Sequence, residues 1–325
     1  MVLIISDNND QTTNLIIDWL DYYGAPWYRI NETDRITVRS IKFLPESEPE
    51  IILHINDNET LNFKDISAYW YRRGTLNLDY TFTTPFEHER LNQAAFYHCK
   101  DERESVRKFL FDYLETYKKS LGGFEEAENK KLYYLVVAQN AGLSIPPTLL
   151  CDSASPLQEF AKGGAALITK SIHETMGAVI SQSEEVYART FEVDRNHINS
   201  QQAFFPSLFQ QNISKWVELR IFFIEMKLFT MAIFSQENDQ TKTDFRNYDA
   251  GRPNRNVPFR LPEVIAEKIR LFIYNSGLST GSIDMIVTHE QEYLFLEVNP
   301  VGQFEMVSYP CNYYLEQNIA QFLIA

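Results

Sequence analysis

The order of apolar and polar positions predicts alternating strands and helices from the start of the chain. Residues 2–5 are apolar and residues 6–10 are turn and helix-cap types, which indicates a buried strand followed by a helix. We expect that helix at 11–23 and another strand at 27–30. Further strands are predicted at 51–55 and 67–71. A β-α-β beginning of this kind indicates a small α/β domain with a partly parallel sheet.

The middle of the chain contains one long helical stretch and then a second series of short elements. Residues 86–122 have a helical pattern that ends at a pair of glycines, and we place a domain boundary there, between 1–123 and 124–325. Residues 191–202 are polar, and no regular structure is predicted for them. Further helices are expected at 129–140 and 156–162, and strands at 148–151, 165–170 and 178–181. Residues 209–213 form either a short strand or a hinge.

Two predicted β-hairpins dominate the last third of the chain. The first pairs 216–224 with 227–235, and the second pairs 281–287 with 293–300. A helix at 262–275 precedes the second hairpin. The stretch 236–260 is polar and has no pattern, and a loop of this length is either functional or disordered.

The second hairpin carries three oxygen-bearing side chains that one cation can share. Asp284 interrupts an apolar strand, and burying a carboxylate is costly unless it is paired or binds a cation. On the next strand Glu297 and Asn299 are expected on one face, and Leu296 and Val298 on the other, because side chains alternate along a strand. Hard oxygen donors of this type suit Mg²⁺. The alternative is three polar residues at strand ends, each bonded to the backbone.

Two arginines, Arg72 and Arg73, follow the strand predicted at 67–71. Strand ends in α/β folds face ligand clefts, so these side chains are candidates for binding an anion or a carboxylate. The alternative is a solvated strand end at which the arginines pair with local acids.

Composition and charge narrow the functional classes. The chain has 325 residues, of which 44% are hydrophobic and 23% charged, which is typical of a folded protein. Its net charge of −14 argues against nucleic acid as a partner, because phosphate backbones require a basic surface. The three cysteines follow no metal or disulfide spacing, the apolar start is too short for a signal peptide, and no apolar run approaches the length of a membrane span. We therefore expect a soluble, cytoplasmic protein with neither nucleic acid nor membrane as a partner.

A series of motifs, taken in order, resembles the ATP-grasp superfamily, and no glycine-rich P-loop is present. The residues within these motifs are most similar to those of the graspetide ligases. These are the microviridin-type and "grasp-with-spasm" enzymes, which cyclise ribosomal peptides (RiPPs). A block at Tyr69–Arg73 resembles their N-terminal domain, so the resemblance extends over the whole chain. The other blocks are Lys130-Lys131-Leu132, Trp216–Arg220, Asp244–Arg246, Ile283–Thr288 and Phe295–Phe304.

The resemblance implies an α/β (α+β) chain with the ATP-grasp fold. Residues 1–123 would be an N-terminal α/β pre-ATP-grasp domain. A lysine-bearing subdomain is expected at about 124–208 and a metal- and phosphate-binding subdomain at about 209–325. The family also implies a homodimer.

Roles in ATP binding follow from the same resemblance. Lys131 and Lys170 would contact the phosphates and the adenine side, with Lys130 as the alternative to Lys131 because the register can differ by one residue. Glu218 would either contact the ribose directly or support a residue that does. The implied ATP site comprises Lys131, Lys170, Gln210, Gln211, Ile213, Glu218 and Asn299.

The resemblance also implies which residues hold Mg²⁺ and act on the transferred phosphoryl group. Mg²⁺ would be held by Asp284, Glu297 and Asn299. Arg220 and Arg246 would bind the γ-phosphate and the substrate carboxylate, since a guanidinium suits both. The implied catalytic residues are Arg220, Arg246 and Lys170.

The implied reaction joins side chains within a precursor peptide that has a leader and a core rich in Thr, Glu and Asp. ATP would convert a Glu or Asp side chain to an acyl phosphate, and a Thr or Ser hydroxyl (ω-ester) or a Lys amine (ω-amide) would displace phosphate. His173 is a candidate base for a hydroxyl, and the alternative is a surface histidine. The hypothesised peptide contacts are Arg72, Arg73, Glu192, Asp194 and Asn196.

Two other functions remain open at this point. The first is a ligase of the RimK or glutathione synthetase type, which joins a carboxylate to an amine on a protein or a metabolite. The second is a non-catalytic protein that binds a nucleotide or a leader peptide. The presence of Lys170, Arg220 and the three expected metal ligands favours an enzyme.

Overall fold

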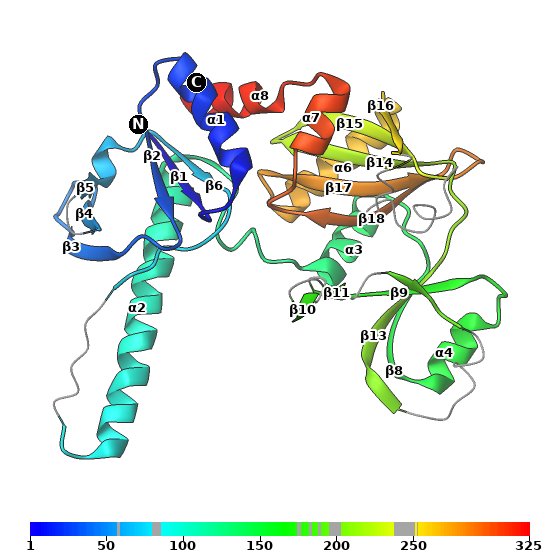
Figure 1. The fold of residues 1–325 in the computed structure, drawn as a ribbon, viewed down its shortest axis with the longest axis horizontal. Helices are drawn as coiled ribbons and strands as arrows, with labels where there is room; N and C mark the ends of the chain where they lie inside the picture. The colour runs from blue at the N-terminus through cyan, green and yellow to red at the C-terminus, as the bar shows by residue number, and fades with distance from the viewer. Residues whose placement is uncertain are drawn as a thin grey trace. The chain divides into compact units, whose positions relative to one another are not determined.

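The chain folds into two compact units, which are shown in the computed structural model of Figure 1. The first unit comprises Met1–Ala127 and Tyr314–Ala325, and the second is Glu128–Tyr313. The structure describes residues 1–56, 59–79, 86–173, 177–181, 184–187, 190–194, 203–236, 251 and 253–325. Within these ranges no helix combines the length and the apolar character that crossing a membrane requires.

The first unit is built on a parallel sheet with the strand order β2-β1-β6-β7. Helix α1 (Gln11–Tyr22) connects the first two strands, and Asp10 caps it by accepting a hydrogen bond from the Thr12 amide at 2.9 Å. All residues of β1 are buried, as expected for a parallel strand covered on both faces. The strands are β1 (Val2–Ser6), β2 (Trp27–Asn31), β6 (Ala68–Tyr71) and β7 (Lys119–Leu121).

Two further helices and a small antiparallel sheet complete the first unit. Helix α2 (Glu89–Tyr117) joins β6 to β7, and its buried residues all lie near its C-terminal end. Helix α8 (Leu315–Ile324) packs on α1 although it comes from the end of the chain. The small sheet contains β3 (Ile36–Lys42), β4 (Glu50–Ile55) and β5 (Glu59–Asn62), and a single 3-10 turn η1 (Phe63–Asp65) follows it.

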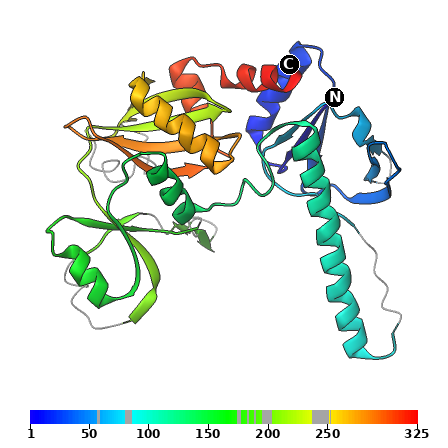
Figure 2. The same cartoon turned by 180° about the vertical axis from the view of Figure 1, so that it is seen from behind.

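The second unit contains a five-stranded antiparallel sheet with the order β16-β15-β14-β17-β18. Helices α3 (Lys131–Asn140) and α6 (Glu263–Ser276) cover one face of this sheet, as Figure 2 shows, and enclose the main core of the unit. Helix α7 (Glu305–Cys311) lies against β14, β15 and β16. The strands are β14 (Val217–Ile224), β15 (Lys227–Phe234), β16 (Arg255–Pro258), β17 (Thr280–Val287) and β18 (Tyr293–Asn299).

A smaller antiparallel sheet precedes it in the same unit, with the order β12-β9-β13-β8. Helix α4 (Ala154–Ala161) packs on it around Leu157, Leu167 and Phe209. A two-stranded hairpin, formed by β10 (Gly177–Ser181) and β11 (Glu184–Tyr187), lies between β9 and β12 in the sequence. The four strands are β8 (Thr148–Ser153), β9 (Leu167–Lys170), β12 (Phe191–Glu192) and β13 (Ala203–Gln211).

Several elements differ from those expected from the pattern. The long helix ends at Tyr117 and is followed by β7, so the prediction of helix to residue 122 is wrong at that end. The stretch 236–260 contains β16, which pairs with β15 and lacks the alternation that reveals a strand. Residues 209–211 of the expected short strand or hinge end a strand that begins at Ala203. Among the described residues, the elements that were not predicted are β3, β5, η1, β7, β11, β12, β16, α7 and α8.

The two units of the structure have other boundaries than the domains expected from the sequence, which meet at residue 123. The structure divides the chain between Ala127 and Glu128, and it assigns Tyr314–Ala325 to the first unit rather than to the second. The physical reason is α8, whose buried residues Leu315, Ile319 and Leu323 pack in the first unit. The Tyr23 hydroxyl also accepts hydrogen bonds from this helix.

Candidate active site

The second unit contains a pocket lined by residues of both of its large sheets. The smaller sheet contributes the end of β9 and the end of β13, and the five-stranded sheet contributes β14, β17 and β18. Many of the residues predicted from sequence to form a site therefore meet here. Those that line the pocket are Lys170, Gln210, Gln211, Ile213, Glu218, Asp284 and Glu297.

Three charged residues form a row across β14, β17 and β18. Arg220 is opposite Asp284, and Asp284 is opposite Glu297. Residues that are opposite in antiparallel strands project from the same face, so this row lies on the face away from the α3–α6 core. The Nη1 atom of Arg220 donates to both carboxylate oxygens of Asp284, at 2.6 and 2.7 Å. Both side chains are buried, and the pairing offsets the cost of removing two charges from water.

A β-bulge in β18 sets the direction of Glu297. Asp284 pairs with Glu297 while the next residue, Met285, pairs with Phe295, so Leu296 is an extra residue on β18. As a result both Leu296 and Glu297 line the pocket. The expectation that Leu296 points away from Glu297 is therefore wrong, because simple alternation does not hold through a bulge.

Lys131 reaches the same row from the first turn of α3. Its Nζ atom lies 3.3 Å from Oε2 of Glu297 and donates to the Ser171 carbonyl oxygen at 2.8 Å. The side chain of Lys131 is 9% exposed, whereas that of Lys130 is 42% exposed and is 3.7 Å from the Glu128 carboxylate. Of the two lysines, Lys131 is the one directed at Glu297.

Glu218 is buried in the pocket with two partners on one of its oxygens. Lys215 Nζ lies 2.9 Å from Glu218 Oε1, and the Ser235 hydroxyl donates to the same oxygen at 2.6 Å. Burial raises the pKa of the Glu218 carboxyl, and nearby Asp284 adds to this, whereas Lys215 and Ser235 lower it. The sequence prediction did not include Lys215 or Ser235. Lys215 precedes β14, and its direction depends on a turn that strand alternation does not describe.

The segment that joins the two sheets borders the pocket on another side. Gln210 is 1% exposed and donates its side-chain amide to the Thr148 hydroxyl at 2.9 Å. The backbone N–H of Gln211 donates to the Pro147 carbonyl oxygen. Asn212, which was not predicted, lines the pocket and donates its side-chain amide to Glu192 Oε1 at 3.0 Å. Glu192, expected to contact a peptide, thus contacts this joining segment.

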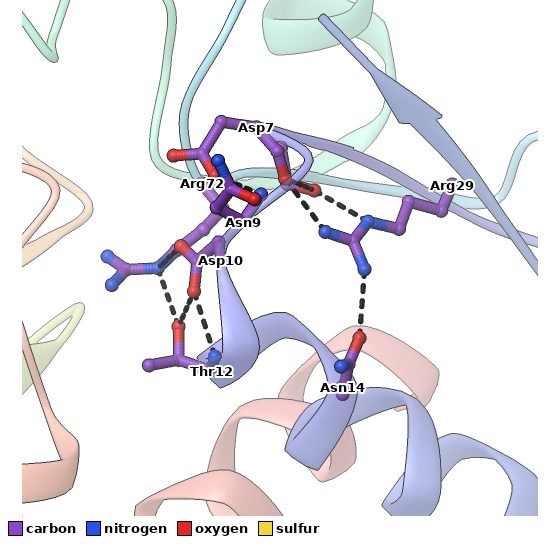
Figure 3. A network of polar contacts seen from close by, with 8 residues as sticks. Asp7, Asn9, Asp10, Thr12, Asn14, Arg29 and Arg72 are labelled. Carbon is purple, nitrogen blue, oxygen red and sulfur yellow. Dashed lines mark hydrogen bonds and ion pairs between the residues drawn. The ribbon is translucent and has the colours of Figure 1, made fainter.

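Arg72 lies in the first unit in a network of polar contacts at the ends of β1 and β6, shown in Figure 3. Its Nε atom is 2.8 Å from Oδ2 of Asp10 and 3.0 Å from the Thr12 hydroxyl. The Arg72 side chain is 3% exposed, and this burial lowers the pKa of its guanidinium. Arg72 thus pairs with a local acid, but in the interior, while Arg73 is exposed.

The remaining predicted residues are placed as follows. Asn299 ends β18 opposite Ser282 and is half-buried, but it does not line the pocket described above. Asp194 is exposed, and so is His173, which lies shortly after β9. Arg246 and Asn196 lie outside the residues that the structure describes.

Comparisons with known proteins concern the fold of the whole chain. No protein-family model and no curated protein matches the chain. The fold is similar to that of the macrocyclase MdnC from Microcystis aeruginosa, which was solved bound with the precursor peptide MdnA. The identity is 28%, the TM-score 0.74, and the match covers 100% of this chain and 99% of that chain. The protein is an ATP-grasp ligase.

Two more distant structures share the fold of this ligase. A RiPP-associated ATP-grasp ligase from Chryseobacterium gregarium, in complex with ADP and a leader and core peptide, is 24% identical with a TM-score of 0.75. That match covers 99% of this chain and 94% of the other. The ATP-grasp ligase PsnB, complexed with a minimal precursor, Mg and ADP, is 15% identical with a TM-score of 0.70. It covers 99% of this chain and 96% of that chain.

The carboxylates of the ligase suit Mg²⁺ that arrives together with a phosphate-bearing substrate. Among the described residues, no three His, Cys, Asp or Glu side chains group into a metal site. Asp284 and Glu297 are direct neighbours across two strands and both line the pocket. Since Mg²⁺ is usually held by one or two carboxylates plus phosphates and water, this pair fits Mg²⁺ better than it fits a resident structural ion.

Proposed function

We propose that this ligase uses ATP to activate Glu or Asp side chains of a ribosomal precursor peptide and then closes macrocycles on that peptide. One observation carries the proposal. The pairs Arg220–Asp284 and Lys131–Glu297 lie together at a pocket that Lys170 also lines. Cations for phosphate and carboxylates for Mg²⁺ are thus assembled at one point, in a chain similar to MdnC over its full length.

In this proposal the nucleotide occupies the pocket between the two sheets. Lys131 and Lys170 bind the phosphates, and the joining segment Gln210–Ile213 borders the adenine. Glu218 is the carboxylate for the sugar, because an acceptor-only group repels phosphate but accepts from a hydroxyl. The close packing around Gln210 and Gln211 supports a rigid wall for a planar base.

Asp284 and Glu297, with Asn299 at the end of the same strand, would hold Mg²⁺. When bound there, the ion would neutralise negative charge on the phosphates. Before a ligand arrives, Arg220 and Lys131 keep the two carboxylates paired, which avoids leaving a charge buried alone. Binding of a nucleotide would then exchange these partners, freeing Arg220 and Lys131 for phosphate oxygens.

The chemistry asks the protein mainly to position reactants and to neutralise charge. A carboxylate oxygen of the peptide attacks the γ-phosphorus of ATP, the bond to the β-phosphate oxygen breaks, and an acyl phosphate and ADP result. A Thr or Ser hydroxyl, or a Lys amine, then attacks the acyl carbon and phosphate leaves. Arg220, with Arg246 from outside the described residues, would stabilise the charge on the transferred group. The net change is the loss of one water per ring.

We propose that the peptide is held outside the pocket by its leader. Glu192, Asp194 and Asn196 remain our hypothesised leader contacts, and exposed Arg73 is better placed than buried Arg72 to meet an acidic core. We further propose a cytoplasmic homodimer. Three cysteines that form no disulfide support a reducing compartment.

The direct test is incubation of the ligase with Mg-ATP and a candidate precursor. The peptide would be encoded in a small reading frame beside the ligase gene and would be rich in Thr, Glu and Asp. Mass spectrometry would count lost waters, and ADP release would be followed in parallel. We expect one water lost and one ADP formed per ring. Water loss without ADP, or neither with any acidic peptide, would contradict the proposal.

The matched pair of variants for this test is Glu297→Gln and Glu292→Gln. Glu297→Gln removes a proposed Mg²⁺ ligand from the pocket, so we expect it to abolish water loss in protein that circular dichroism shows to be folded. Because Lys131 loses its charged partner, the unfolding temperature should fall as well. Glu292 is exposed in the turn before the same strand, and its variant should behave like the wild type. A Glu297→Gln enzyme that still dehydrates the peptide would refute the role of Glu297 as an Mg²⁺ ligand.

A further inference from the structure

A buried lysine beside Glu218 has no role in the reaction described so far. Lys215 is 8% exposed, lies just before β14 and lines the pocket. Its Nζ atom is 2.9 Å from Glu218 Oε1. Ser235, which is fully buried after β15, donates its hydroxyl to that same oxygen. Two groups from separate segments of the chain, one before β14 and one after β15, therefore converge on one carboxylate oxygen.

The other oxygen of Glu218 is the one left for a ligand. Among the described residues, no hydrogen bond or ion pair to Glu218 Oε2 is found, although Glu218 lines the pocket. A carboxylate held by one oxygen cannot rotate freely, so its second oxygen keeps a fixed direction. An ionised carboxylate accepts hydrogen bonds and cannot donate them. A ligand atom that forms a hydrogen bond with Oε2 must therefore carry the hydrogen, as a sugar hydroxyl does and a phosphate oxygen does not.

Two other cations near the pocket, Arg220 and Lys131, have carboxylate partners other than Glu218. Arg220 pairs with Asp284 across β14 and β17, and Lys131 pairs with Glu297. Burial raises the pKa of the Glu218 carboxyl, and without a cation beside it the group would tend to hold a proton. Lys215 supplies that cation.

We propose that Lys215 is a positioning residue which, with Ser235, fixes the Glu218 carboxylate by Oε1 so that Oε2 accepts a ribose hydroxyl of ATP. This inference rests on the proposed function, because it takes ATP as the occupant of the pocket. Lys215 itself does not touch the nucleotide in this arrangement. Its effect on binding must therefore pass entirely through Glu218.

The test measures equilibrium binding of ATP, 2′-deoxy-ATP and 3′-deoxy-ATP in the presence of Mg²⁺. We expect the wild type to bind ATP at least about tenfold more tightly than one of the deoxy analogues, since a hydrogen bond to a charged group is worth about that much. Lys215→Met and Glu218→Gln should both lose this preference. Lys215→Arg, which keeps the charge, should retain most of it, and Lys227→Met, at an exposed lysine of β15, should retain it fully.

The double variant Lys215→Met/Glu218→Gln separates the two possible roles of the lysine. If Lys215 acts through Glu218, the double variant should bind ATP as Glu218→Gln does, because the effects of coupled residues do not add. It also removes both charges of the buried pair, so it remains a test if Lys215→Met alone fails to fold.

Three results would overturn the inference. Additive losses in the double variant, or an equal loss for ATP and both analogues in Lys215→Met, would mean that Lys215 contacts the nucleotide directly. A wild type that binds ATP but does not prefer it over either analogue would remove the hydroxyl contact. Absence of any ATP binding by the wild type would instead overturn the proposed function itself.

Discussion

At the scale of single residues, the pocket contains buried carboxylates that each pair with a cation. Asp284 pairs with Arg220, Glu297 with Lys131 and Glu218 with Lys215. Removing one member of such a pair leaves an uncompensated charge and costs about 3–5 kcal/mol, whereas removing both is often neutral. Variants at this site therefore need a binding or activity measurement beside a stability measurement.

Arg220 offers the sharpest single substitution. Arg220→Lys keeps a positive charge near Asp284 but loses the planar guanidinium, whose Nε has no hydrogen-bond partner among the described residues. We expect product formation to fall by about 10²–10³-fold, the size of effect seen when one preorganised donor to a transition state is removed. The dissociation constant for ATP should change far less.

The control for this prediction is Arg270→Lys. Arg270 lies on α6 and forms partly exposed ion pairs with Glu263 and Glu267, so its variant should leave turnover unchanged. Single-turnover formation of ADP would compare the two variants. Normal ADP formation in Arg220→Lys would refute the proposed role.

The sequence predicted the carboxylates of the site better than their partners. Asp284 and Glu218 interrupt apolar strands, and strand alternation is enough to place them on one face. Strand alternation does not predict the direction of Lys215, because this residue precedes β14. Leu296 was placed on the wrong face because a bulge inserts one residue without a sequence signature.

At the scale of elements, the segment after β18 packs against the start of β17 at a point where only glycine fits. Gly302 has a φ of +35°, and a Cβ atom there would lie 2.7 Å from both the amide nitrogen and the hydroxyl of Ser282. We expect Gly302→Ala to lower the free energy of unfolding by about 1–3 kcal/mol. Urea unfolding would measure this.

Gly163→Ala is the matched control for that variant. Gly163 lies in the turn after α4, and a Cβ atom there would meet nothing within 4 Å. Its stability should stay within about 0.5 kcal/mol of the wild type. If both alanine variants unfold at the same urea concentration, the packing argument for Gly302 is wrong.

Near the end of α2, Glu115 forms a hydrogen bond with the segment that follows β7. Its Oε1 accepts from the Phe124 amide at 2.6 Å, and the Phe124 ring stacks on Phe111. Burial raises the pKa of Glu115 from 4.5 to about 7, and Glu126 and Asp112 act in the same direction. The folded state therefore binds this proton more tightly than the unfolded state. The resulting stability is fully present below pH 4.5 and is lost as the pH rises through about 7.

Glu115→Gln stays neutral at every pH, so it removes this dependence. We expect the free energy of unfolding of the variant, relative to the wild type, to increase as the pH rises from 4.5 to 7. Urea unfolding at several pH values across this window would show the trend. Glu102→Gln, at an exposed position of the same helix, should show no trend of its own. A flat difference for Glu115→Gln would contradict the assignment.

Elements with a strong internal pattern were predictable, and those that depend on a partner were not. β14 and β17 are buried throughout and read as apolar runs. β16 has four residues of mixed polarity and exists because it pairs with β15. Helix α8 did have a signal, since Leu315, Ile319 and Leu323 recur at helical spacing. That pattern predicts a helix but not the unit in which it packs.

At the scale of the whole molecule, α8 is a helix of the first unit that is supplied by the end of the chain. Ile319 is 1% exposed, and Ile319→Ala should cost about 2–5 kcal/mol. We expect hydrogen exchange to become faster in β1, β6 and α1 but not in β14 and β17. Faster exchange confined to the second unit would show that this helix stabilises the other part of the molecule.

Ile324→Ala is the control in the same helix. Ile324 is 39% exposed, so truncating its side chain opens no cavity and should leave exchange rates close to those of the wild type. The comparison separates the packing of α8 from its helix propensity, because both variants replace isoleucine with alanine.

The packing of α8 in the first unit also has a consequence for the order in which the two units fold during synthesis. Residues 1–127 leave the ribosome before the second unit does, but the first unit lacks α8 until residues 314–325 have been synthesised. The second unit lies wholly between these two pieces, so it can fold while the first is still incomplete. On the growing chain, the second unit, which contains the candidate active site, can therefore be complete before the first unit is.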